Sequence, residues 1–88
     1  MNDLSKSCKI TIQYDRELSQ IVGRRVEINV VSEGLPFVMF LNFFFKTYPE
    51  IERKFPPGAL AFLINGVAPL NDTVLKDGDK IAFAAYSK

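Results

Sequence analysis

The chain has 88 residues, of which 48% are hydrophobic, and a formal net charge of +1. One domain with one core is the expectation at this length, and the balanced charge gives no reason to expect nucleic acid or an anionic membrane as a partner. Histidine is absent and Cys8 is the only cysteine, which removes the commonest general base, the commonest zinc ligand and any intrachain disulfide.

The first part of the chain predicts a hairpin of two half-buried strands. After a polar stretch over residues 1–7, expected to be a flexible N-terminal tail, hydrophobic and polar residues alternate over residues 8–15 and again over residues 24–31. Such alternation is typical of a strand with one face in the core. The connection over residues 16–23 is predicted to be a loop. The core side chains expected from these strands include Ile10, Ile12, Val26 and Ile28.

Residues 36–48 predict the main helix, because Pro36 suits a first helical turn and Pro49 stands near the end. The apolar residues form two stripes at helical spacing. The stripe expected to pack on the sheet contains Val38, Leu41, Phe45 and Tyr48. The second stripe contains Phe37, Phe40 and Phe44. We interpret the second stripe as an exposed protein interface, most simply of a symmetric homodimer; the alternative is a core contact wide enough to need all three rings.

The second half predicts further strands joined by turns. Residues 49–58 are expected to form a loop, residues 59–65 a strand, and Asn65-Gly66 a tight hairpin turn, because both residues tolerate positive φ. A short edge strand over residues 67–70 and a last strand over residues 80–86 follow. Ile64, Ile81 and Phe83 are expected in the core.

This order of elements predicts an α+β protein of the ubiquitin-like β-grasp class. We expect a mixed sheet of four to five strands with one main helix packed across one face, and the first and last strands parallel at the centre. The open face of such a sheet brings four residues together as a second candidate interface: Leu63, Ala82, Ala84 and Tyr86. The alternative is the ordinary apolar content of a protein surface.

Two segments resemble the small sulfur-carrier proteins of the MoaD and ThiS type. They are residues 59–66, which end in Ile64-Asn65-Gly66, and residues 72–83, which contain Leu-Lys-Asp-Gly-Asp. The resemblance implies a place in molybdopterin-type or thiamine-type pathways and partners such as an activating enzyme or a synthase subunit. It also implies a terminal Gly-Gly that is converted to a thiocarboxylate, whereas the sequence here has Ser87 and Lys88.

The expected function is therefore that of a non-catalytic protein-binding module, with no catalytic residue, cofactor or metal. Two alternatives stay open: an active sulfur carrier whose Gly-Gly is absent from this sequence, and a structural homo-oligomer. No apolar run has the length of a membrane span or the form of a secretory signal, which favours a cytoplasmic protein. Residues 8–88 are expected to form a single domain.

Overall fold

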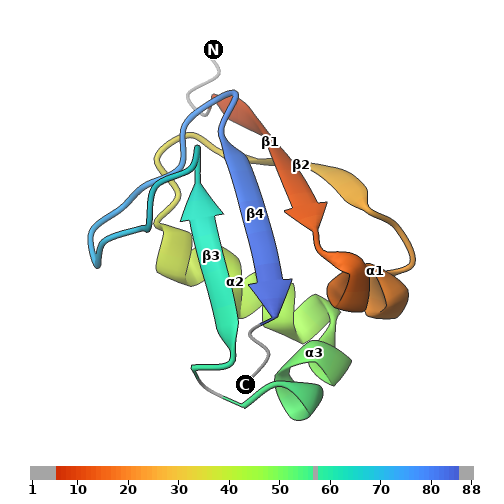
Figure 1. Cartoon of the computed structure of the whole chain (residues 1–88). Coiled ribbons are helices and arrows are strands. Elements are labelled where there is room, and N and C mark those ends of the chain that lie inside the picture. Colours follow the sequence, from red (N-terminus) through yellow and green to blue (C-terminus); the bar gives the residue numbers. More distant parts are fainter. Residues whose placement is uncertain (1–5, 57, 86–88) are drawn as a thin grey trace.

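The computed structural model describes residues 6–56 and 58–85, and in these the chain forms one sheet with helices packed on it (Figure 1). The elements in chain order are β1 (Ser7–Tyr14), α1 (Arg16–Val22), β2 (Val26–Ser32), α2 (Phe37–Thr47), α3 (Pro49–Lys54), β3 (Leu60–Ile64) and β4 (Lys80–Ala85).

The sheet has the predicted topology. Its four strands lie in the order β2-β1-β4-β3, with β1 parallel to β4 at the centre and antiparallel pairs on either side. In Figure 1, α2 lies across the sheet, behind β3 and β4. A hairpin, a covering helix and a central parallel pair make this the ubiquitin-like β-grasp fold. The predicted strand over residues 67–70 does not form in the part of the chain described: Val67 makes only an isolated bridge to Ile64 across the Asn65-Gly66 turn.

The face of β2 that packs towards the core is the opposite of the predicted one. Val26, Ile28 and Val30 are 51%, 60% and 66% exposed, so the prediction that the first two belong to the core is wrong. The side of β2 that faces α2 carries Glu27 and Asn29 instead. Alternation alone indicates that a strand has two unlike faces, and it does not say which one the helix covers.

The helix α2 is also rotated relative to the prediction. Phe37, Phe40 and Phe44 are only 3–4% exposed and form its core face. Leu41 and Phe45 are partly buried and pack against that core, whereas Val38 is exposed. The rings of Phe44 and Phe83 meet edge to face with centroids 4.6 Å apart, so the stripe of three Phe side chains fills the space over the sheet. The prediction that the three Phe side chains are exposed is wrong, and the alternative of a wide core contact holds.

Two segments predicted to be loops contain short helices. α1 begins after Asp15, whose Oδ1 accepts a hydrogen bond from the backbone N–H of Leu18 at 2.8 Å, and it ends at Gly23, which has φ +93°. A carboxylate N-cap and a glycine with positive φ are the usual signals of helix ends. α3 begins at Pro49 and buries Ile51. Each helix thus contributes a buried side chain to the core.

The central strands supply the rest of the core as predicted. Ile10, Ile12, Ile64, Ile81 and Phe83 are all buried. The first strand begins earlier than predicted, because Ser7 of β1 already pairs with Ser32 of β2. The carbonyl of Lys6 also accepts a hydrogen bond from the N–H of Glu33 at 2.8 Å. The rest of the predicted tail, residues 1–5, lies outside the described residues.

Candidate protein-binding surface

The face of the sheet opposite α2 gathers small and apolar side chains from β3 and β4. The strand register places Leu63 beside Ala82, and Ala61 beside Ala84. Leu63 is 42% exposed, while the three alanines are partly buried because their side chains are short. We call these four residues the β3–β4 patch. Its shallow, apolar surface around one leucine is typical of a protein contact and gives little depth for a small molecule.

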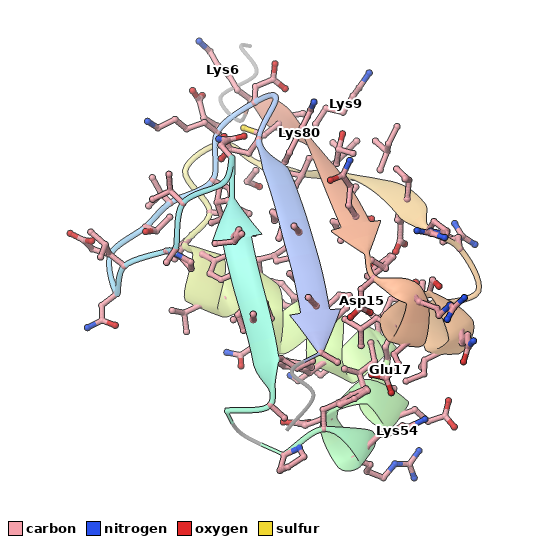
Figure 2. All side chains as sticks on the ribbon, viewed as in Figure 1. Lys6, Lys9, Asp15, Glu17, Lys54 and Lys80 are labelled. Carbon is pink, nitrogen blue, oxygen red and sulfur yellow. The ribbon has the colours of Figure 1, made fainter. Side chains whose placement is uncertain are left out.

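Basic side chains border this face at one end of the sheet. Lys80 begins β4 and pairs with Thr11 of β1, and Lys9 lies two residues before Thr11 on the same face of β1. Figure 2 shows Lys9 and Lys80, together with Lys6, at the end of the sheet where β4 begins. A protein that docks on this face therefore meets positive charge along one side, which favours acidic groups in the partner.

Asp15 fixes the opposite end of β4. Its backbone N–H donates to the carbonyl of Phe83 at 3.1 Å, and its Oδ2 accepts from the N–H of Ala85 at 2.7 Å. The same carboxylate caps α1, so the last residue of β4 is tied to a helix. Figure 2 shows Asp15 at this end of the sheet. The predicted interface residue Tyr86 and the tail residues Ser87 and Lys88 follow directly, and they lie outside the described residues.

The turn motifs that carry the family resemblance have a structural role here. Asn65 adopts φ +53°; its side chain donates to Asp79 Oδ1 at 2.9 Å and accepts from the N–H of Lys80 at 3.0 Å. Asp79 Oδ2 also accepts from the N–H of Lys76 at 2.8 Å, and Asp77 accepts from the N–H of Lys9 at 2.7 Å. These bonds hold the ends of β1, β3 and β4 together and so position Lys80 beside the β3–β4 patch.

The described residues hold no group of three or more His, Cys, Asp or Glu side chains arranged to bind a metal. Cys8 is buried, as expected of a small core residue; burial raises the pKa of its thiol, and the charges of Glu33 and Asp77 act in the same direction. A thiol in that state is a poor nucleophile. Nowhere in residues 6–56 and 58–85 is there a helix with the length and hydrophobicity that crossing a membrane requires.

Of the residues singled out in the sequence, the structure brings Leu63, Ala82 and Ala84 together on one face. It places Phe37, Phe40 and Phe44 in the core. Sequence reasoning missed the exposed row on β2, Val26, Ile28 and Val30. The polar residues between them, Glu27 and Asn29, alternate with this row just as clearly, so the pattern offered no means to choose the outer face.

No protein-family model and no curated protein sequence matches this chain. Solved structures do match it along nearly its whole length. A crystal structure of small archaeal modifier protein 1 from H. volcanii has a TM-score of 0.75 at 17% identity and covers 91% of this chain and 99% of that one. The chain has the fold of the small archaeal modifier proteins.

Two further structures extend the likeness to this modifier fold. A protein of Pyrococcus furiosus named molybdopterin converting factor, subunit 1, has a TM-score of 0.76 at 22% identity and covers 91% of this chain and 99% of its own. The HVO 2177 protein of Haloferax volcanii has a TM-score of 0.79 at 14% identity and covers 100% of this chain and 92% of its own. At these identities the likeness establishes the fold, and it agrees with the MoaD-like β-grasp expected from residues 59–83.

Proposed function

We propose that this chain is a non-catalytic protein-binding module of the sulfur-carrier type, which docks a partner protein on the β3–β4 patch. The observation that carries the proposal is the half-exposed Leu63 among alanines on the sheet face that α2 does not cover. The names of the similar structures support it: one is a modifier protein and another a subunit of a molybdopterin converting factor, and both names describe small proteins that act together with other proteins.

The patch has the form of a small binding hot spot. Fully covering an exposed leucine side chain contributes about 1.5–3 kcal/mol, and Leu63, which is 42% exposed, contributes less than that. The flanking alanines allow a flat partner surface to approach closely. Association itself costs several kcal/mol, so this patch alone supports only weak binding. Lys9 and Lys80 add a charge contribution that favours an acidic partner and speeds its approach. Binding should therefore weaken as the salt concentration rises.

The expected partner is a protein resembling an activating enzyme or a synthase subunit, because these are the partners that the sulfur-carrier resemblance implies. Asp15 fixes the end of β4 at Ala85. The alternative of an active carrier makes use of the same patch and differs only in the chemistry of the residues that follow.

The test measures binding of purified activating-enzyme-like and synthase-subunit-like proteins to immobilised chain. Leu63→Asp should weaken binding at least about tenfold, the factor that corresponds to about 1.4 kcal/mol. Val38→Asp is the matched control, because Val38 is an exposed apolar residue on α2, on the other side of the sheet. Equal weakening by both variants, or no binding by either partner class, would overturn the proposal.

A further inference from the structure

β2 is an edge strand that lacks two of the common protections against pairing. It ends the sheet order, and among the described residues only β1 pairs with it. Its sequence, Val-Glu-Ile-Asn-Val-Val-Ser, contains no lysine and no proline, the residues that commonly prevent one edge strand from pairing with another. Three of its side chains, those of Val26, Ile28 and Val30, are apolar and more than half exposed.

The same three residues present their backbone groups to the open edge. At one end of β2 the N–H of Tyr14 donates to the carbonyl of Arg25 at 2.9 Å, and at the other the N–H of Glu33 donates to the carbonyl of Lys6 at 2.8 Å. Hydrogen-bonded positions alternate along an antiparallel pair, so the residues bonded to β1 are the odd-numbered ones from Arg25 to Glu33. The N–H and C=O groups of Val26, Ile28 and Val30 therefore point away from the sheet.

We propose that β2 pairs with β2 of a second copy of this chain, antiparallel and about a two-fold axis at Asn29. Only an axis at Asn29 overlaps the whole of Val26–Ser32 with itself. It sets Ile28 opposite Val30 of the second copy, and by symmetry the reverse. It also sets Arg25 directly opposite Glu33 of the second copy at both ends. Both side chains are exposed, so length, apolar contact and charge all select the same alignment.

The neighbouring helix supports this choice of axis. Asn29, Val30 and Phe43 line a hollow of 280 Å³ between β2 and α2, and Phe43 is 54% exposed. A two-fold axis perpendicular to a sheet keeps the helices of both copies on the same side of the joined sheet. Phe43 of each copy then lies near the axis and loses exposure to water. Self-complementary charge and shape favour a second copy over an unrelated strand.

The first experiment measures mass in solution by sedimentation across the micromolar to millimolar range. The parent chain should move from 9.9 kDa towards twice that mass. Ile28→Lys places a charge in the paired edge and should keep the chain monomeric, with an unchanged melting temperature because Ile28 is exposed. Leu63→Lys is the matched control and should dimerise like the parent. That control also separates this inference from the proposed function, which rests on Leu63.

The second experiment exchanges the two charges. Arg25→Glu alone and Glu33→Arg alone each place like charges opposite one another twice, and each should dimerise about tenfold more weakly than the parent. An equimolar mixture of the two variants forms a mixed pair with both contacts attractive, so association should return to the parent's strength. Such recovery is not expected from a merely structural effect of either substitution.

Three results would overturn the inference. One is a parent chain that stays monomeric to about 1 mM, the weak limit of measurable association. Another is an Ile28→Lys variant that dimerises like the parent. The third is a charge-exchanged mixture that associates no better than its components. A monomeric parent whose β2 edge accepts an added synthetic strand peptide would assign the edge to a foreign strand and likewise reject the self-pairing.

Discussion

The backbone N–H of Ala85 donates a 2.7 Å hydrogen bond to Asp15 Oδ2, joining the last residue of β4 to a residue 70 positions earlier. The second oxygen of the same carboxylate accepts from the N–H of Leu18 and caps α1. One side chain therefore sets both where a helix begins and where the final strand ends.

Asp15→Ala should lower the free energy of unfolding by roughly 2–4 kcal/mol, because it removes a helix cap and a hydrogen bond to a charged acceptor. Urea denaturation followed by circular dichroism measures the loss. Asp15→Asn is the control: its amide keeps one acceptor oxygen and should lose about half as much. A free energy for Asp15→Ala within about 0.5 kcal/mol of the parent, the range of ordinary surface changes, would contradict this role.

Alkaline pH should destabilise the fold through two tyrosines. Tyr14 donates to Glu27 at 2.6 Å, and burial, then this hydrogen bond, raises the pKa of Tyr14 above its ordinary value. Burial and the Glu27 charge likewise raise the pKa of Tyr48. The folded state thus holds both protons more tightly than the unfolded chain does. Their stabilising contribution is complete below about pH 10 and is lost as the pH rises above it.

The measurement for this effect is urea denaturation at steps between about pH 8 and pH 11, which bracket the ordinary tyrosine pKa. Tyr14→Phe should flatten the fall in stability above about pH 10, and Tyr48→Phe should flatten it less because Tyr48 is less buried than Tyr14. The difference between parent and variant is the informative quantity, because it isolates the contribution of the tyrosine that was changed. Parallel curves for parent and Tyr14→Phe would refute the assignment.

Two adjacent phenylalanines on α2 should lose very different amounts of stability on truncation to alanine. Phe44 packs against Phe83 at 4.6 Å and Tyr48 at 5.3 Å between ring centroids, so Phe44→Ala should cost about 3–5 kcal/mol. Phe43→Ala, on the exposed side, should cost less than about 1 kcal/mol. Thermal and urea unfolding at low micromolar concentration, where self-association is negligible, give both values. The reverse order would mean that α2 is rotated in solution relative to this structure.

The identity of residues 87 and 88 should decide whether this fold accepts sulfur by the carrier route. The double variant S87G/K88G, incubated with a cognate activating enzyme, ATP and a sulfur donor, should gain the mass of one sulfur in place of oxygen. The 88-residue chain should not, because the sulfur-carrier resemblance implies an enzyme channel that fits glycine, whereas Lys88 carries a long side chain. Adding Leu63→Asp to the double variant should suppress conversion if docking uses the β3–β4 patch. Conversion of the parent at the variant's rate would refute the steric argument.

The sequence was sufficient for the β-grasp topology because its strands alternate and its turns carry strong signals. The outer face of β2 could not be predicted. Glu27 is satisfied by Tyr14 and by Tyr48, which donates to it at 3.2 Å, and this pairing lets a carboxylate lie beneath the helix. Partners so distant in sequence leave no mark on a local pattern. The helix α1 was missed for a different reason: its signals are local, but Asp15, which caps it, was assigned to the end of the first strand.

The exposed face was predicted correctly for the β3–β4 patch and wrongly for α2, because the sheet topology determines which face the patch residues occupy. Once β4 lies between β1 and β3, alternation places Leu63, Ala82 and Ala84 on one side. For α2, two apolar stripes at the same spacing competed, and both contain aromatic rings. Three Phe side chains fill the space against Phe83 better than the stripe that contains Val38. Packing volume, which periodicity does not measure, decided the outcome.

The polar inner side of β2 has a consequence for how the hairpin finds its alignment. A slip of β2 by one residue along β1 would turn Val26 and Ile28 under α2 and send Glu27 into water. On hydrophobic pattern alone the slipped pairing is the more favourable of the two. The hydroxyls of Tyr14 and Tyr48, which bind Glu27 only in the observed alignment, oppose that slip. The two tyrosine hydroxyls therefore determine which of the two alignments β2 adopts. In the alignment that they stabilise, Val26 and Val30 face water.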